Sequence, residues 1–258
     1  MDPSRARRSS AASTLRTAAV WSTLSEAAAQ QAAALGRPLR VLDLGGGTGG
    51  LAVPLAEEGH DVTVVDPSPD ALASLRRRAT ETGVADRVRA VQGDTDSVHD
   101  VVGANARFDL ICVHGTLEVA DDPDAAIAHV AGLLDEGAVL SIVVAQRLSA
   151  ALARALAGEF ERAQAILERP DGRWGDGDPG PRRYDEASVV DLLTRHGLDV
   201  QTSHGVRIFS DHVPSALLDT EADRRDLLAL EATASTLSHT YPLLGSLGAA
   251  LHVLAHRH

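Results

Sequence analysis

Residues 39–50 read LRVLDLGGGTGG, a short apolar run followed by a glycine-rich turn. The apolar run is typical of a buried β-strand, and the glycines are typical of a turn that opens a helix. A second apolar run, VTVV at 62–65, ends in Asp66, roughly 20 residues after the glycines. This order of strand, glycine turn, helix, strand and acid predicts a βαβ unit that binds a nucleoside.

Asp43 lies two residues before the first glycine, and its charge separates two classes of ligand. Gly45, Gly47 and Gly50 also fit the dinucleotide pattern G-x-G-x-x-G. A dinucleotide places a pyrophosphate at the start of the helix, where Asp43 would repel it. S-adenosylmethionine (SAM) carries an ammonium and a sulfonium group, so the acid favours SAM over NAD or FAD. A glycine turn that binds nothing is the remaining alternative. The cofactor-binding residues expected here are Asp43, Gly45, Gly46 and Gly47.

Further acidic residues follow the next two predicted strands. Asp66 is suited to accept hydrogen bonds from both ribose hydroxyls of an adenosyl group, although a turn aspartate is the alternative. The sequence GDTD at 93–96 follows the predicted strand 87–92, where an adenine ring would lie. Either Asp94 or Asp96 is suited to accept from the adenine amine. An ordinary loop of turn-forming residues explains GDTD nearly as well.

The composition limits the class of protein. The 258 residues carry a formal net charge of -12, and all 24 Lys and Arg residues are arginines. This acidic balance argues against a broad nucleic-acid footprint but leaves room for a local basic patch. The single cysteine, Cys112, lies in the apolar run LICV and is expected to be a buried strand thiol. We see no run of transmembrane length and no signal peptide, so we expect a cytoplasmic protein.

The order of apolar runs predicts an α/β fold in a single domain, 1–258, with a flexible start at 1–12. Helices are expected at 13–35, 48–58, 69–82 and 123–134, and strands at 39–44, 62–66, 87–92, 108–113 and 138–145. Ser68 before Pro69 is a typical helix start, as is Pro123. Strands that alternate with helices at this spacing predict a mostly parallel sheet with helices on both faces.

The alternation stops after residue 145. Residues 147–183 are expected to form an insertion, with one or two helices at 147–168 and an Asp- and Gly-rich loop at 169–183. A helix at 185–196, a strand at 199–209, a helix at 215–237 and a strand at 248–256 complete the chain. The insertion follows the carboxyl end of a strand, where open α/β sheets bind ligands. We therefore predict a lid or substrate segment, with a surface excursion of no functional role as the alternative.

His114 follows the fourth predicted strand, on the edge of the sheet where the cofactor is expected. It is a candidate for contact with SAM or the substrate, and a structural histidine is an equal alternative. Methyl transfer from a sulfonium needs alignment of donor and acceptor, and it needs a general base only if the acceptor is protonated. A carboxylate acceptor needs no base, and His114 is the one obvious base. The 11 histidines show no metal-ligand spacing with acids or cysteine, so we expect no metal.

Several motifs occur together between residues 13 and 256. They are VLDLGGGTG at 41–49, EGHDV at 58–62, HGTLEVADDP at 114–123, AGEFERAQA at 157–165, GVRIFSD at 205–211 and a last-strand motif near His252. Together they resemble the class I SAM-dependent methyltransferases. Within that class they resemble the bacterial tRNA 5-carboxymethoxyuridine methyltransferase family (CmoM, formerly SmtA), which acts at the wobble position. The first motif is common to the superfamily, and those at 157–165 and 205–211 are far more specific.

The resemblance implies a Rossmann-like methyltransferase with a seven-stranded sheet and an inserted helical lid. It implies SAM as the cofactor, with contacts from Arg16, Gly45, Gly46, Asp66, Thr95, Asp96 and His114. A guanidinium such as that of Arg16 is suited to hold the SAM carboxylate bidentately. Arg207, inside GVRIFSD, is the candidate for binding an acidic acceptor, and an edge-strand charge is its alternative. Arg207 and His114 are therefore the expected catalytic residues.

The resemblance also implies tRNA as the partner. Family members carry a lysine-rich insertion, whereas the insertion here is rich in Asp and Gly and contains no lysine. A small-molecule methyltransferase of specialised metabolism therefore stays as an alternative, as does a SAM-binding protein without turnover.

Overall fold

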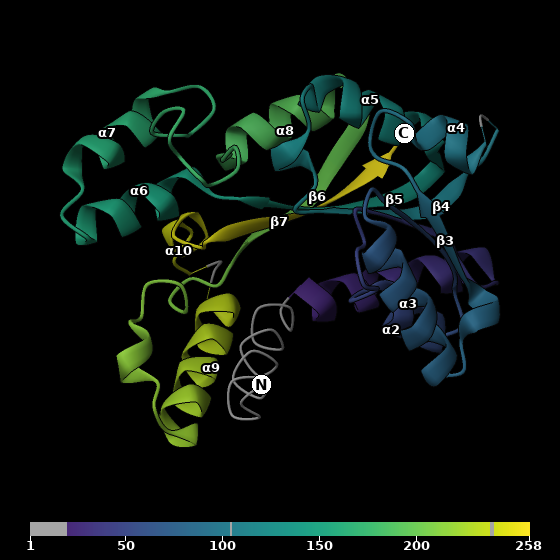
Figure 1. Cartoon of the computed structure of the whole chain (residues 1–258), viewed down its shortest axis with the longest axis horizontal. Coiled ribbons are helices and arrows are strands. Elements are labelled where there is room, and N and C mark those ends of the chain that lie inside the picture. The colour runs from purple at the N-terminus through teal and green to yellow at the C-terminus, as the bar shows by residue number, and fades with distance from the viewer. Residues whose placement is uncertain (1–19, 104, 238–239) are drawn as a thin grey trace. The chain divides into compact units, whose positions relative to one another are not determined.

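The structure is a computed structural model that describes residues 20–103, 105–237 and 240–258. The described strands form one seven-stranded sheet in the order β3-β2-β1-β4-β5-β7-β6 (Figure 1). Their bounds are β1 Arg40–Leu44, β2 Asp61–Asp66, β3 Val88–Gln92, β4 Phe108–His114, β5 Leu134–Ala145, β6 Leu198–Val206 and β7 Ala250–Arg257. β1 pairs in parallel with β2 and β4, and the pairs β2–β3 and β4–β5 are also parallel. The predicted α/β class and seven-stranded sheet are confirmed.

Helices flank this sheet. Their bounds are α2 Ala52–Glu57, α3 Pro69–Glu81, α4 Val98–Val102, α5 Pro123–Leu133, α6 Arg147–Leu156, α7 Phe160–Glu168, α8 Glu186–Arg195, α9 Glu221–Thr236 and α10 Leu243–Ser246, with short 3-10 turns at Ala85–Arg87, Leu117–Val119 and Ser215–Leu217. Residues 20–35 are also helical. In Figure 1, α2 and α3 lie on one side of the sheet, and α4, α5 and α8 lie on the other. Helices on both faces explain why β1 and β4 are buried along almost their whole length.

The central strands carry much of the core. Leu42 of β1 pairs with Ile111 of β4, and neither side chain is exposed. Cys112 is also fully buried, which confirms the predicted strand thiol. Burial raises the pKa of this thiol well above its ordinary value, because the thiolate would lose its hydration.

Two helix starts follow the predicted capping chemistry. The hydroxyl of Ser68 accepts a hydrogen bond from the N–H of Ala71 at the start of α3. Asp122 accepts from the N–H groups of Asp124 and Ala125 at the start of α5. Each cap satisfies N–H groups that have no partner inside the helix. Both helices lie in the βα units that place the loops of the candidate site.

Some elements differ in extent from the expectation. The helix predicted at 48–58 begins only at Ala52, because residues 47–51 continue the glycine turn. The helix predicted at 215–237 begins at Glu221, because Thr220 and Asp223 form a capping box there. β5 begins at Leu134, ahead of the predicted 138. The short α4 and α10 were not predicted, and residues 13–19 of the first predicted helix lie outside the described residues.

The described residues divide into two compact units. One holds the described parts of Ser25–Val144, Ala187–Ser203 and Val253–His258. The other holds those of Met1–Leu24, Ala145–Glu186 and His204–His252. The expected single domain over 1–258 stays a prediction, and the flexible start at 1–12 lies outside the described residues.

The insertion at 147–183 has an ordered interior. Its helices α6 and α7 pack against each other. Its two ends meet, since the N–H of Tyr184 donates to the Ala145 carbonyl and the N–H of Arg147 donates to the Tyr184 carbonyl. In the loop, the buried carboxylate of Asp178 pairs with Arg183 at 2.7 Å. Burial alone would raise the pKa of Asp178, but Arg183 and the N–H groups of Trp174 and Gly180 lower it to about 2. The predicted helices and loop are therefore present, and the role as a lid stays a prediction.

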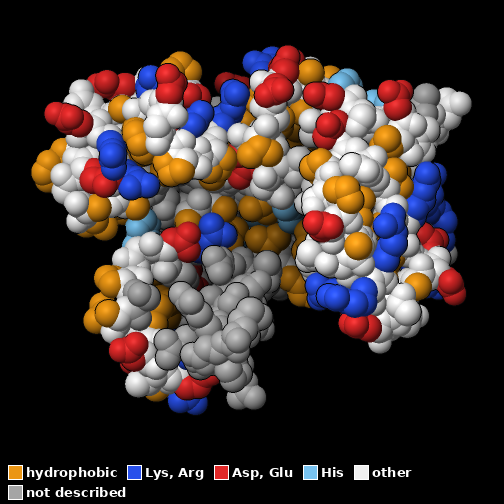
Figure 2. All heavy atoms as spheres, in the orientation of Figure 1, with side chains coloured by type: hydrophobic (Ala, Val, Ile, Leu, Met, Phe, Trp, Pro, Cys, Tyr) orange, Lys and Arg blue, Asp and Glu red, His pale blue; other side chains and the backbone are white. Residues whose placement is uncertain are grey.

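The helices of the insertion also present apolar side chains to the surface. Hydrophobic side chains are visible over α6 and α7 in Figure 2. The exposed ones are Leu148, Leu156, Phe160 and Leu167. Within the described ranges, no helix is long and apolar enough to cross a membrane.

Candidate active site

The glycine turn after β1 passes directly over the side chain of Asp43. Asp43 is only 2% exposed. A Cβ atom placed on Gly46 would lie 2.3 Å from Oδ2 of Asp43, which is closer than real Cβ contacts allow. Glycine at 46 therefore lets the backbone of the turn close over the carboxylate.

The carboxylate of Asp43 is electrostatically unusual. In the described part of the chain, its Oδ2 atom has no hydrogen-bond partner. Burial, together with the nearby charge of Asp66, raises the pKa of Asp43 to about 7. An uncompensated buried carboxylate at this position is suited to a cationic ligand, because the cation would supply the missing stabilisation of the charged form.

Asp66 at the end of β2 is held by two backbone donors. The N–H of Gly47 donates to Oδ2 at 2.9 Å, and the N–H of Ser68 donates to Oδ1 at 2.9 Å. The residue is 8% exposed. A carboxylate oxygen accepts two hydrogen bonds, so each oxygen keeps capacity for one more donor, such as a ribose hydroxyl.

Thr116 fixes the start of the same turn. The N–H of Gly45 donates to the carbonyl of Val65 at 2.7 Å, and the Thr116 hydroxyl donates to the carbonyl of Leu44 at 2.9 Å. A Cβ atom on Gly45 would lie 2.1 Å from the Thr116 hydroxyl. Sequence reasoning did not single out Thr116, although it lies inside the HGTLEVADDP motif at 114–123.

In the loop after β3, the structure distinguishes the roles of Asp94 and Asp96, the two candidate acceptors for the adenine amine. The carboxylate of Asp94 accepts hydrogen bonds from the N–H and the hydroxyl of Ser97 and from the N–H of Asp96, and these donors lower the pKa of Asp94. Asp94 therefore shapes the turn. Asp96 is exposed, and its carboxylate has no hydrogen bond or ion pair in the described part of the chain. Thr95 is buried, and its carbonyl oxygen lies 3.0 Å from Nδ1 of His129 on α5.

His114 lies at the carboxyl end of β4, as predicted. Its Nε2 atom lies 2.8 Å from the hydroxyl oxygen of Ser141 on β5. Burial lowers the pKa of His114 to about 4. The ring is therefore neutral near pH 7 and is a weak general base.

Comparison of the sequence with known proteins identifies a family whose matched region contains the site described above. A methyltransferase-domain family model matches residues 41–137, which contain Asp43, Asp66 and His114. The tRNA 5-carboxymethoxyuridine methyltransferase of Escherichia coli (strain K12) is 30% identical over 199 residues, covering 77% of this chain and 73% of that protein. The chain belongs to the class I SAM-dependent methyltransferases. The predicted SAM cofactor and the predicted enzyme class are confirmed with the family.

Other relatives agree with this family. An uncharacterised methyltransferase from Mycobacterium bovis is 38% identical over 202 residues, covering 76% of this chain and 69% of that protein. The crystal structure of magnesium protoporphyrin IX methyltransferase from Synechocystis PCC 6803 with bound SAH has a TM-score of 0.59. It is 17% identical, and the match covers 94% of this chain and 85% of that chain. At this identity the likeness shows the shared Rossmann-like fold.

Arg207 of this methyltransferase belongs to the other compact unit, with Ala145–Glu186 and His204–His252. It follows β6, and its φ of 58° lies in the left-handed region. Its Nε atom donates to Asp211 at 3.2 Å, whereas neither Nη atom has a partner in the described part of the chain. Arg207 lines a pocket of about 350 Å³. Arg16, the other arginine expected at the site, lies outside the described residues.

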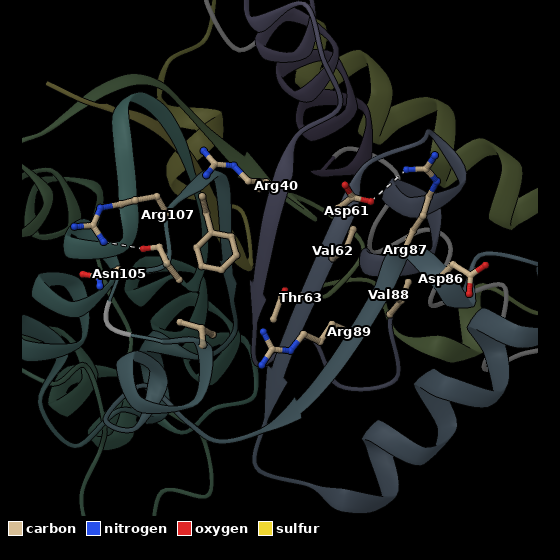
Figure 3. A pocket seen from close by; sticks show the side chains of 13 residues that line it. Arg40, Asp61, Val62, Thr63, Asp86, Arg87, Val88, Arg89, Asn105 and Arg107 are labelled. Atoms are coloured by element: carbon tan, nitrogen blue, oxygen red, sulfur yellow. Dashed lines mark hydrogen bonds and ion pairs between the residues drawn. The ribbon is translucent and has the colours of Figure 1, made fainter.

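A second hollow lies at the amino-terminal ends of β1 to β4, the opposite edge from Asp43 and Asp66 (Figure 3). It has a volume of about 480 Å³ and is lined in part by Arg40, Arg87, Arg89 and Arg107. Arg87 pairs with Asp61 at 3.2 Å. Arg40 and Arg37 pair with the buried carboxylate of Asp109, whose pKa they lower. These pairs tie the strand ends together.

Sequence reasoning missed Asp109, because its arginine partners are about 70 residues away in the chain and only the parallel pairing of β1 and β4 brings them together. Within the described ranges, no group of three or more His, Cys, Asp or Glu side chains is placed to hold a metal ion.

Proposed function

We propose that this methyltransferase transfers the methyl group of SAM to a carboxylate, and that its acceptor is 5-carboxymethoxyuridine in tRNA. The observation that carries the proposal is the 30% identity, over 77% of the chain, to the Escherichia coli enzyme that acts on this nucleoside. The specific motif GVRIFSD at 205–211 adds support. The cytoplasm is the corresponding location for such an enzyme.

In the proposed cofactor site, each acid has a distinct part of SAM to bind. Asp66 is already oriented by two N–H groups and accepts from the ribose hydroxyls. Asp43, with a buried oxygen that has no hydrogen-bond partner in the described part of the chain, offers its charge to the cationic end of SAM. Asp96 accepts from the adenine amine. Gly45, Gly46 and Gly47 bring the backbone of the turn against the cofactor, and Arg16 binds the SAM carboxylate.

The reaction is an in-line displacement. An oxygen of the acceptor carboxylate attacks the methyl carbon, the bond from that carbon to sulfur breaks, and its electron pair stays on sulfur. The sulfonium becomes the neutral thioether of S-adenosylhomocysteine, and the carboxylate becomes a methyl ester. No proton is removed, so alignment and exclusion of water suffice.

The state of His114 favours a carboxylate over a hydroxyl acceptor. A hydroxyl would need a base, and a histidine with a pKa of about 4 is a poor one. His114 therefore contacts SAM or the acceptor as a neutral hydrogen-bonding group. Its bond to the Ser141 hydroxyl fixes the ring.

Arg207 is the proposed acceptor-binding residue. Its side chain is 23% exposed, and in the described part of the chain both Nη atoms are without partners. A planar guanidinium with two such groups binds a carboxylate bidentately. The insertion at 147–183, with exposed apolar side chains on α6 and α7, is the proposed lid or substrate segment.

A small-molecule carboxylate is the second candidate acceptor. The formal net charge of -12 and the absence of lysine favour it, because a protein that binds RNA neutralises phosphates with basic side chains. The chemistry at the methyl group would be the same, and only the acceptor would differ.

Expression of the chain in an Escherichia coli strain that lacks its own tRNA 5-carboxymethoxyuridine methyltransferase tests the proposal. We expect mass spectrometry of nucleosides from its tRNA to detect the methyl ester of 5-carboxymethoxyuridine. The empty vector is the control. If the expressed protein is folded and binds SAM but forms no ester, tRNA is not the acceptor.

A further inference from the structure

The backbone at Arg207 needs support from elsewhere in the fold. Arg207 is the one residue other than glycine with a left-handed φ in the described part of the chain. Side chains disfavour this conformation, and it persists only where the surroundings hold it. Such positions are common at functional sites.

Glu231 on α9 supplies this support. Its Oε2 atom accepts from the N–H of Ile208 at 3.0 Å. Its Oε1 atom accepts from the N–H of Phe209 at 2.9 Å and from the N–H of Ser210 at 2.7 Å. The Ser210 hydroxyl also donates to Oε1. One carboxylate thus binds all three N–H groups that follow Arg207, a concave set of donors that favours an anion.

The same arrangement leaves the guanidinium of Arg207 available. Glu231 is occupied by backbone donors, and Arg207 pairs through Nε with Asp211. The Nη atoms therefore remain for a ligand. Arg207, Ser210 and Glu231 line the same pocket, together with Gly205, Leu228 and Ser235.

At Gly205, which also lines this pocket, the absence of a side chain allows a close approach to the backbone of Gly245. A Cβ atom there would lie 2.1 Å from the carbonyl oxygen of Gly245. The chain before Arg207 is thus fixed by a close backbone approach, and the chain after it is fixed by Glu231. Contacts on both the amino-terminal and the carboxy-terminal side of Arg207 therefore fix its backbone conformation.

We propose that Glu231 is a positioning residue for the acceptor: it holds the turn at 208–210 so that Arg207 presents both Nη atoms to the acceptor carboxylate. This inference rests on the proposed function. Glu231 itself does not touch the reacting atoms.

The test compares E231Q with wild type in methyl transfer to tRNA that carries 5-carboxymethoxyuridine. We expect E231Q to lower kcat/KM at least tenfold, mainly through a higher KM for tRNA, with the Kd for SAM within twofold. E221Q is the matched control, since Glu221 lies on the same helix with a side chain that is 78% exposed. It should match wild type. If E231Q folds poorly, E231D replaces it as the test variant. E231D keeps the charge but shortens the side chain, and it should show the same loss of at least tenfold in kcat/KM.

A double-variant cycle separates positioning from general structural damage. Glu231 acts through Arg207, so E231Q should cost less than twofold further in an R207G background. Wild-type kinetics for E231Q, or a full tenfold further loss in R207G, would overturn the inference while the proposed function stands. If wild type itself transfers no methyl group to this tRNA, the proposed function fails and the inference fails with it.

Discussion

The backbone N–H of Gly47 donates to Oδ2 of Asp66 at 2.9 Å. This bond joins the glycine turn after β1 to the acid at the end of β2. With the second bond from Ser68, it orients the carboxylate before any cofactor arrives. Folding has already ordered these groups, so in the proposed site SAM binding would not have to order them, which would favour affinity.

Replacement of Asp66 by alanine should weaken SAM binding by about 1–3 kcal/mol, because the ribose hydroxyls lose a buried acceptor. Isothermal titration calorimetry measures this directly. Asp70→Ala is the control, since Asp70 is an exposed aspartate in the first turn of α3 and should leave the affinity unchanged. An unchanged Kd in a folded Asp66→Ala variant would remove Asp66 from the site.

SAM affinity should rise with pH between pH 6 and pH 8. Asp43 has a pKa of about 7, so it is mostly protonated at pH 6 and mostly ionised at pH 8. The ionised form binds the cationic cofactor, so the Kd should fall by up to about tenfold over this range. Asp43→Asn should flatten the profile. A pH-independent Kd in the wild type would exclude Asp43 from charge pairing with SAM.

Asp43 should also lower the stability of the ligand-free protein at alkaline pH. Its pKa is higher in the folded state than in the unfolded chain, so stability decreases as pH rises through about 4 to 7. Asp43→Asn removes this penalty and should stabilise the protein at pH 8 by on the order of 1–3 kcal/mol. Urea unfolding at pH 5 and pH 8 measures the difference. A gain of equal size at both pH values would contradict this origin.

The sequence was informative where function depends on spacing along the chain. Asp43, the glycine turn and Asp66 lie within one βαβ unit, so their order predicts that they meet at one sheet edge. The local pattern GDTD did not choose between Asp94 and Asp96, and only the family resemblance favoured Asp96, because the choice depends on which carboxylate caps the local turn. Roles set by side-chain hydrogen bonds in a loop have no periodic pattern to reveal them.

Contacts between residues that are far apart in the chain could not be predicted from the sequence either. Glu231 is one of several acids on a largely polar helix, and only the folded chain shows that it binds the N–H groups at 208–210. The left-handed backbone of Arg207 was equally hidden, since residues other than glycine seldom adopt it. The GVRIFSD motif pointed to the place but not to this geometry.

Substitutions of Arg207 should distinguish the contribution of its side chain to methyl transfer from the contribution of its backbone conformation to stability. Arg207→Gly and Arg207→Ala both remove the guanidinium and should impair methyl transfer at least tenfold, since one charge-assisted contact contributes roughly 1.5–3 kcal/mol. SAM affinity should stay within about twofold. A left-handed φ of 58° costs alanine roughly 1–2 kcal/mol and glycine little, so Arg207→Gly should be more stable than Arg207→Ala by about 1 kcal/mol. Thermal unfolding and kinetics on both variants test this, and full activity of either variant would remove Arg207 from acceptor binding.

The most direct test of the account is the fate of a labelled methyl group. Wild-type protein is incubated with methyl-labelled SAM and tRNA from an Escherichia coli strain that lacks its own tRNA 5-carboxymethoxyuridine methyltransferase. A methyl ester hydrolyses in mild alkali, so the account predicts label on the tRNA that alkali releases as methanol. Absence of label from the tRNA, or label that alkali does not release, would contradict carboxylate methylation of tRNA.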